Sequence, residues 1–293
     1  MAEKRTPGER VFDFSNVLFM FLIVVLTLYP FLYVAFSSLS NPVRLTAHQG
    51  PLFWPLGFDL SSYAAVLKNP MIVVGYRNTL FNVVLGTSLN LFMTSLGAYV
   101  LSRKRYFWKR FIMFSIVFTM FFSGGLVPFY LNIKMLGLLN TRWALILPPA
   151  ISTYNLIVMR TSFAAIPDSM EESAKMDGAN DFVILFRIIM PLSLPVVAVM
   201  LLFYGVYHWS AWFNAAILLQ TRTLYPLQLV LREILIQSST DSMSTGASGM
   251  DKELVGEGIK YATIMVATLP ILFIYPFLQK YFVKGIMVGA IKE

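Results

Sequence analysis

Long apolar stretches separated by polar ones dominate the pattern of this chain. A helix needs roughly 20 mostly apolar residues, at about 1.5 Å each, to cross about 30 Å of hydrocarbon. Segments of suitable character predict six spans, at about Val17–Ser37, Thr79–Leu101, Phe111–Ile133, Trp143–Met159, within Pro195–Leu219, and at Tyr261–Phe282. We therefore expect an all-α membrane protein with one transmembrane domain over residues 1–293.

Composition supports a membrane protein and excludes some chemistry. The chain is 57% hydrophobic and 13% charged, with a mean hydropathy of +0.67, whereas soluble domains carry about 25% charged residues. It contains no cysteine and only two histidines, His48 and His208. Disulfides and thiolate metal sites are therefore excluded, and we expect no metal centre.

The positive charge predicts the orientation in the bilayer. Arg103–Arg110, RKRYFWKR, holds five basic residues and no acid. Short loops rich in Lys and Arg stay in the cytoplasm, so both termini should also be cytoplasmic, in agreement with Lys280, Lys284 and Lys292. The net charge of +8 is explained in this way, and we expect no nucleic-acid partner. The first apolar segment is interpreted as a retained helix, not a signal peptide.

The segment 220–260 is predicted to lie outside the membrane on the far face. Thr223–Gln237 carries apolar residues at helical spacing and predicts a short helix. Small and polar residues follow in Ser238–Glu253, which predicts a flexible loop. It is long for a simple connector, so contact with a partner is favoured over that alternative.

The segment 160–195 is a polar insert between two apolar stretches, on the cytoplasmic side. Asp168 is placed to cap a short helix over about Ser169–Met176, with Glu171 completing a capping box. Gly178 is placed to end this helix, because glycine accepts the left-handed conformation.

A second helix should follow, capped by Asn180 or Asp181, and Pro191 and Pro195 should kink or break the chain beyond it. The first helix is too short to be stable alone. Either a groove on a soluble partner or packing against the other cytoplasmic ends must hold it.

The spacing of this insert resembles a known family pattern. Glu172-Ser173-Ala174, three residues, Gly178, nine residues and Ile188-x-Met190-Pro191 is similar to the EAA loop of ABC-importer permeases, E-A-A-x3-G-x9-I-x-L-P. Ser173 and Met190 are mild departures from it. The resemblance extends to the carbohydrate branch of the family through Phe163, Ile166-Pro167, Asp177-Gly178-Ala179 and Gln279–Glu293. Phe121–Phe163 is similar to a subgroup that imports oligosaccharides of complex polysaccharides, alginate among them.

The resemblance implies one permease subunit of an ATP-driven importer in the cytoplasmic (inner) membrane of a bacterium. Its implied partners are a second permease subunit, in a heterodimer, two ATPase subunits and an extracytoplasmic solute-binding protein. The loop would be a coupling helix docked in a cleft on the ATPase. Residues implied in this coupling are Met170, Glu171, Glu172, Ala174, Asp177, Gly178, Ala179 and Pro191. From the residues alone, Asp177 could equally cap its own turn.

We expect no enzymatic activity and no bound cofactor in this chain. No G-x-x-x-x-G-K-[ST] loop is present, so ATP and Mg should bind the partner subunits. An ion-coupled secondary transporter is the alternative, but such proteins often bury ionisable groups within their spans. The nearly charge-free apolar stretches argue against it. A structural membrane scaffold is also possible, but would not need the EAA spacing.

The fifth predicted span carries candidate residues for a substrate pathway. Tyr204, His208 and Trp212 stand at positions i, i+4 and i+8 on one helix face, and Trp209 and Asn214 face elsewhere. Aromatic faces stack on sugar rings, and polar residues within a span are functional candidates by default. An aromatic belt or a subunit contact is equally consistent. Asn82 and Asn90 of the second span are expected to join helices by hydrogen bonds.

Overall fold

The computed structural model describes residues 7–103, 108–244, 256–273 and 276, with side chains to 236 in the helix that ends at 244. The chain divides into two compact units. Unit 1 combines Met1–Asn69 with Leu231–Thr268, and unit 2 combines Pro70–Val230 with Leu269–Glu293. The described residues are helical or irregular apart from an isolated antiparallel bridge between Ser40 and Phe58. The all-α expectation is confirmed for this part of the chain.

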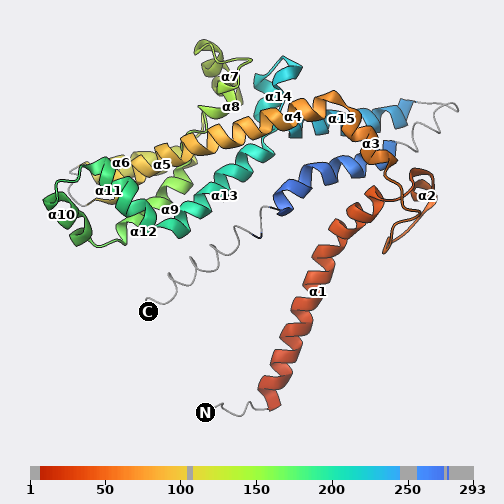
Figure 1. The fold of residues 1–293 in the computed structure, drawn as a ribbon, viewed down its shortest axis with the longest axis horizontal. Coiled ribbons are helices and arrows are strands. Elements are labelled where there is room, and N and C mark those ends of the chain that lie inside the picture. The colour runs from red at the N-terminus through yellow and green to blue at the C-terminus, as the bar shows by residue number, and fades with distance from the viewer. Residues whose placement is uncertain (1–6, 104–107, 245–255, 274–275, 277–293) are drawn as a thin grey trace. The chain divides into compact units, whose positions relative to one another are not determined.

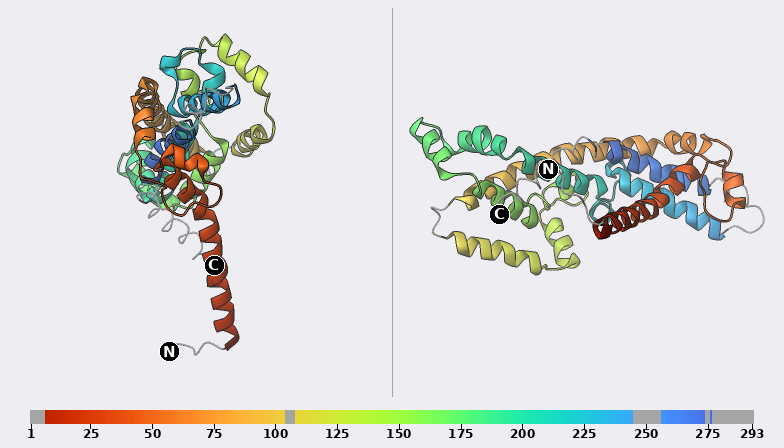
Figure 2. Two further views of the ribbon diagram at one scale, coloured as in Figure 1. Left: turned by 90° about the vertical axis from the view of Figure 1, so that its right-hand side faces the viewer. Right: turned by 90° about the horizontal axis from the view of Figure 1, so that it is seen from below.

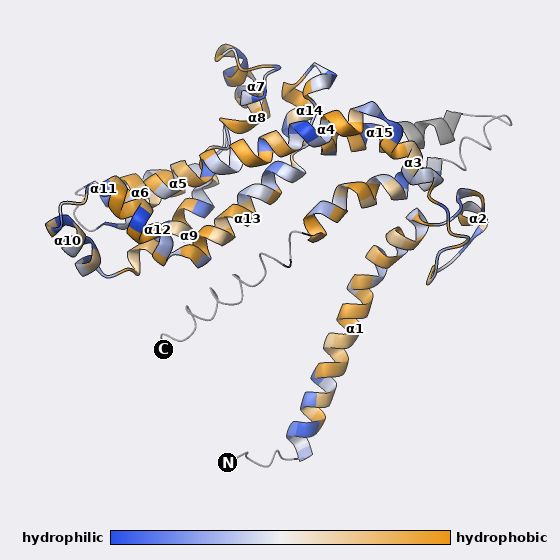
Figure 3. Ribbon diagram, in the orientation of Figure 1, coloured by the Kyte–Doolittle hydropathy of each residue, from blue (hydrophilic) through white to orange (hydrophobic). Residues whose placement is uncertain are grey.

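Unit 1 contains α1 (Pro7–Ser38), α2 (Pro42–Ala47), α3 (Ser61–Lys68), and the helical segment 256–268. Side chains of α1 are mostly exposed and apolar over its middle, as Figure 3 shows. In a bilayer such a surface faces lipid or another helix. The first predicted span, Val17–Ser37, thus lies within one continuous helix.

Unit 2 contains the remaining helices. Its elements are α4 (Pro70–Phe81), the π-helix η1 (Asn82–Gly86), α5 (Thr87–Ser102), α6 (Lys109–Phe121), α7 (Leu126–Met135), α8 (Trp143–Ile146), α9 (Thr153–Ala164), α10 (Asp168–Met176), α11 (Asp181–Ile184), the π-helix η2 (Leu185–Ile189), α12 (Met190–Leu192), α13 (Leu194–Ser210), α14 (Phe213–Leu218) and the 3₁₀ turn η3 (Arg222–Leu224). The helix α15 (Leu227–Ser244) begins in unit 2 and continues into unit 1. Helices α5, α9 and α13 pack together (Figure 1), and their buried side chains form the main apolar core.

Two described helices are long and apolar enough to cross a membrane, Pro7–Ser38 and Pro70–Ser102. The second joins α4, η1 and α5 without a break, so it contains and extends the predicted span Thr79–Leu101. Two bent pairs would raise the number to four. They are α6 with α7, bent by 114°, and Asp181–Leu192 with α13, bent by 91°.

Three predicted spans are interrupted where single helices were expected. The third breaks between α6 and α7 at Gly124 and Gly125, because Gly125 takes a left-handed φ of 84°. Figure 2 shows α6 and α7 standing apart from the long helix of their unit. The fourth breaks at Pro148 and Pro149, since proline cannot donate a helical hydrogen bond. The fifth ends at Ser210 and resumes in α14.

The expected helix over Thr223–Gln237 is present as α15, which starts at Leu227. It runs on to Ser244, so the prediction of a flexible loop from Ser238 is wrong for its first residues. Helix propagation is cooperative, and an established helix continues readily into residues of modest propensity. Residues 245–253 of that predicted loop lie outside the described residues. So do residues 104–107 of the basic loop, residues 274–275 and 277–282 of the sixth predicted span, and the C-terminal segment Gln279–Glu293.

Candidate functional site

The polar insert forms the predicted short helix, α10, with a well-defined end. Gly178 has a φ of 83°, its N–H bonds the carbonyl of Lys175 at 3.1 Å, and the N–H of Ala179 bonds the carbonyl of Ala174 at 3.0 Å. This pair of bonds is the Schellman motif, which satisfies the carbonyls at a helix end. The role of Gly178 is conformational, because a Cβ built there meets nothing within 4 Å.

The start of α10 differs from the predicted capping box. Pro167 takes the N-cap position with φ −58° and ψ 137°, and its own side chain makes no capping hydrogen bond. Asp168 is already the first helical residue, so its carboxylate is not placed as an N-cap acceptor. The prediction was wrong because proline fixes the extended conformation one residue earlier. The next helix follows the expectation, as Asn180 Oδ1 accepts a hydrogen bond from the N–H of Val183 at 2.9 Å.

The two faces of α10 have different surroundings. Ala174 is buried in the main apolar core with Phe163 and Ile184, so its small side chain permits close packing within this chain. Glu172 and Met176 lie on the opposite, exposed face, whereas Met170 and Asp177, four residues before and three residues after Ala174, are exposed beside the packed face. Met176, which the sequence analysis passed over, is 83% exposed.

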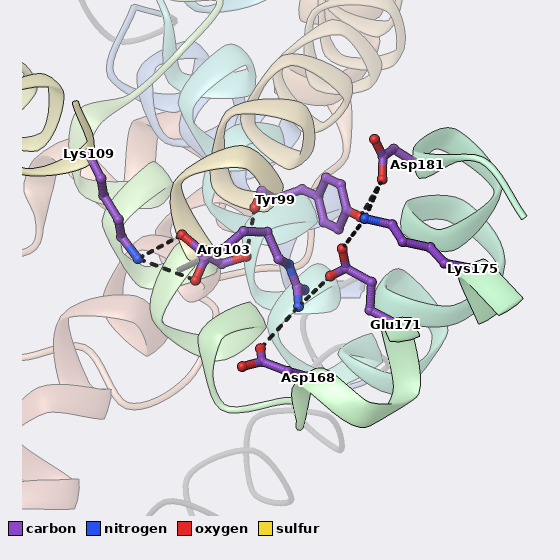
Figure 4. A network of polar contacts seen from close by, with 8 residues as sticks. Tyr99, Arg103, Lys109, Asp168, Glu171, Lys175 and Asp181 are labelled. Atoms are coloured by element: carbon purple, nitrogen blue, oxygen red, sulfur yellow. Dashed lines mark hydrogen bonds and ion pairs between the residues drawn. The ribbon is translucent and has the colours of Figure 1, made fainter. Parts of the chain in front are cut away.

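A network of charges ties α10 to the end of α5 (Figure 4). Arg103 Nη1 lies 2.9 Å from Glu171 Oε2 and 4.0 Å from Asp168 Oδ1. The guanidinium also lies over the Tyr99 ring, 4.9 Å from its centroid. The side chains of Arg103 and Glu171 are each only 13% exposed. Glu171, expected to act in coupling, is thus bound by its own chain.

Lys175 extends this network to the next helix. Its Nζ lies 2.7 Å from Glu171 Oε1 and 3.2 Å from Asp181 Oδ1, and Tyr99 donates a hydrogen bond to Asp181 at 3.3 Å. The hydrogen bond to Glu171 raises the pKa of the Lys175 amine. A raised lysine pKa means that the contribution of the pair is present at neutral pH and is lost only as pH rises through that raised value.

Sequence reasoning missed Arg103 and Tyr99 as parts of this site. Arg103 counted only toward the charge that orients the chain. No spacing rule links the end of α5 to α10, so the pairing becomes visible only in the fold. Pro191, the last coupling residue expected, lies exposed in α12 beside the 91° bend, where the predicted kink is confirmed.

The pathway candidates Tyr204 and His208 lie on one face of α13, as expected, but both are buried. The Tyr204 hydroxyl lies 2.7 Å from Thr94 Oγ1 and accepts a hydrogen bond from the Ser152 N–H at 3.2 Å. Ser152 belongs to the break between α8 and α9. Backbone groups freed by such a break need partners, because none are available in lipid.

His208 is linked through Asn90 to the same break between α8 and α9. Its Nε2 lies 2.7 Å from Asn90 Oδ1, and Asn90 Nδ2 donates to the carbonyl of Pro149. Asn90 therefore joins helices, as predicted. Asn82 differs, since its buried Oδ1 has no hydrogen-bond partner among the described residues.

The remaining pathway candidates lie elsewhere. Trp212 follows the end of α13, so the predicted i, i+4, i+8 face stops at His208. Asn214 lies in α14, half-buried. Trp209 is buried and lines a largely apolar cavity of about 310 Å³. The other lining residues are Val83, Val84, Thr87, Ser88, Leu201, Leu202, Gly205, Val206 and Ile271.

Residues 96–288 match the family of binding-protein-dependent transport system inner membrane components. The chain belongs to this family. Protein LplC of Bacillus subtilis (strain 168) is 40% identical over 288 residues, covering 98% of this chain and 97% of its own length. The polygalacturonan/rhamnogalacturonan transport system permease protein YtcP of the same strain is 39% identical over 284 residues, covering 97% and 99%.

A solved structure is also similar to this family member. A bacterial ABC transporter involved in the import of the acidic polysaccharide alginate has a TM-score of 0.86 at 32% identity, covering 96% of this chain and 100% of that one. These findings confirm the expectations of an ABC permease fold and of a transport component that is not an enzyme.

Proposed function

We propose that this permease subunit belongs to an ATP-driven importer of oligosaccharides, with six spans and both termini in the cytoplasm. The complex would contain a second permease subunit, two ATPase subunits that bind ATP and Mg, and an extracytoplasmic solute-binding protein. Family membership supports the binding protein. The basic run Arg103–Arg110 supports the orientation.

The six-span proposal follows from the helices and their breaks. Two continuous helices and two bent pairs account for four spans. The broken pair α8 and α9 would make a fifth, and the segment from residue 256 onward a sixth. Proline breaks of this kind are tolerated in spans when other residues satisfy the freed backbone, as Tyr204 and Asn90 do here.

The observation that carries the coupling proposal is the division of α10 into two faces. One face is packed and ion-paired to the chain's own helices, so α10 is held in place. The opposite face exposes Glu172 and Met176, and Met170 and Asp177 are exposed beside the packed face. Exposed methionines interspersed with carboxylates fit an ATPase cleft with an apolar floor and a basic rim.

The proposed substrates are oligosaccharide fragments of acidic polysaccharides, alginate or polygalacturonan fragments among them. The names of YtcP and of the similar solved transporter motivate this class. Trp209 has the strongest structural support as a pathway residue, because it borders a largely apolar cavity together with Thr87 and Ser88. Tyr204 and His208 would reach a sugar only if their present hydrogen bonds opened, and Trp212 and Asn214 remain secondary candidates.

Reconstitution of the four-subunit complex in proteoliposomes tests this function. Uptake of a labelled alginate pentasaccharide and an oligogalacturonide, with maltopentaose as a neutral control, is measured with binding protein outside and ATP inside. We expect uptake of an acidic glycan that needs ATP and persists when ionophores collapse all ion gradients. Uptake that follows an ion gradient without ATP would support the secondary-transporter alternative, and preference for maltopentaose would reject the acidic substrate class.

A further inference from the structure

We propose that Arg103 is a positioning residue that fastens α10 to the long helix Pro70–Ser102, so that the two move as one body. This rests on the proposed function, in which an ATPase acts on α10. The Arg103 contact adds a route by which a movement of α10 reaches the membrane. The continuous helix of α4, η1 and α5 is the element to which this movement is transmitted.

The position of Arg103 suits this role. It is the C-cap residue of α5, and its N–H bonds the carbonyl of Val100 at 3.4 Å. Lys109 donates to the carbonyls of Ser102 and Arg103, at 3.3 and 3.2 Å. The backbone of Arg103 is therefore held at the helix end while its side chain reaches α10.

The contact with α10 is stronger than an ordinary surface ion pair. Exposed pairs contribute about 0–1 kcal/mol because water screens them. Arg103 and Glu171 are largely shielded, and the Tyr99 ring lies under the guanidinium. The ion pair of Arg103 Nη1 with Glu171 Oε2 positions Glu171, and with it the first turns of α10. Arg103 Nε and Nη2 are buried without a hydrogen-bond partner among the described residues.

Other attachments of α10 are less direct. The chain itself leads from α10 to α9 and α11, and Lys175 joins it to Asp181 of α11, which accepts a hydrogen bond from Tyr99 of α5. Ala174 supplies apolar packing without direction. Arg103, at the end of the long helix, pairs directly with Glu171 and Asp168 of α10. Glu171 therefore has a structural role within this chain, whereas its neighbour Glu172 is exposed.

Distance measurements between two spin labels test the link without any need for substrate. The chain has no cysteine of its own, so Ser169→Cys in α10 and Leu80→Cys in α4 label two exposed positions. The whole transporter, with its ATPases, is placed in nanodiscs. Distances are measured without nucleotide and after trapping with ATP, Mg and vanadate. The same two labels are measured in four proteins: one with no further change, Arg103→Gln, Glu171→Gln and the control Arg187→Gln. Arg187 is an exposed residue of η2.

With Arg103 in place, the distance distribution should be the same in both nucleotide states, and Arg187→Gln should give the same result. In Arg103→Gln and Glu171→Gln the distribution should shift on trapping, because α10 moves without the long helix. Uptake per ATP hydrolysed should also fall by about tenfold, within the range that couples two sites in one protein. Arg103→Lys, which keeps the positive charge, should retain part of the wild-type uptake per ATP hydrolysed.

A shift on trapping in the otherwise wild-type network, or none in either glutamine variant, would overturn the proposal. Failure of both glutamine variants to assemble would show a folding contact only, and would overturn it too. Co-purification of the ATPase is scored first on the wild-type complex. If the ATPase does not co-purify with the wild-type complex, the proposed function is rejected. If it does co-purify, the distance measurements test the role of Arg103 alone.

Discussion

The imidazole of His208 in α13 lies directly against the backbone of Gly86, the last residue of η1. A Cβ built on Gly86 would overlap the ring at Nε2 and Cε1. The ring has little freedom to withdraw, because it is buried and Nε2 is bonded to Asn90. The π-helix and the buried histidine therefore depend on each other, which gives a reason for a glycine at this position.

Gly86→Ala should destabilise unit 2 by about 1–3 kcal/mol, the usual cost of overpacking a filled interior. Thermal unfolding of the detergent-solubilised protein, followed by size-exclusion fluorescence, measures this. Gly205→Ala in α13 is the matched control, since its Cβ meets nothing within 4 Å. It should leave stability unchanged or raise it by up to about 1 kcal/mol through helix propensity. Equal effects of the two substitutions would reject this account.

Tyr204→Phe should cost about 1–3 kcal/mol, because it leaves the Thr94 hydroxyl and the Ser152 N–H without their partner. The same unfolding assay applies. Tyr154→Phe removes the same hydroxyl from an exposed residue of α9 and should change stability by no more than about 0.5 kcal/mol. If Tyr204→Phe were as mild, the hydroxyl would not be supporting the break between α8 and α9.

Gly178→Asp should abolish ATP-driven uptake while the protein still inserts in the membrane. Asn and Asp both tolerate the left-handed conformation better than other side chains. Gly178→Asn is therefore a control of the same shape, and it should retain most uptake. The carboxylate of the aspartate variant would add charge beside Asp177 on the proposed docking face. Normal uptake by the aspartate variant would count heavily against the coupling role of this turn.

Asn140→Ala should loosen the contact between the start of α8 and the end of α14. Asn140 has a φ of 56°, and its Oδ1 accepts hydrogen bonds from the N–H groups of Gln220 and Thr221, both at 2.9 Å. Each bond contributes about 0.5–1.5 kcal/mol. Asn140→Asp keeps the acceptor oxygen for both hydrogen bonds and should be milder. Faster hydrogen exchange at residues 220 and 221 reports the loss, and protection as high in the alanine variant as in the wild type would contradict it.

The insert around α10 shows how far local rules reach. Its length, its glycine end and a cap at Asn180 or Asp181 are consequences of neighbouring residues, so they could be predicted from the sequence, and the structure uses Asn180. The capping box failed for a local reason too, since Pro167 competes for the same position. The burial of Ala174 could not be predicted, because the helices that cover it come from distant segments.

The pathway candidates show the opposite limit. Helical periodicity places Tyr204 and His208 on one face of α13, and it does so correctly. It does not say that this face packs against α5 and the break at Pro148–Ser152. Trp212 was grouped with them because the sequence pattern continues past Ser210, where the helix does not.

The sequence by itself determined that the chain is helical and apolar, that a short polar helix ends at Gly178, and which family it belongs to. These properties depend on composition, on backbone preferences of single residues and on local spacing. Only the tertiary structure decided which charges pair and which polar side chains support the broken helices. Arg103 meets Glu171, and His208 meets Gly86, because packing brings together segments far apart in the chain, and no local pattern encodes that meeting.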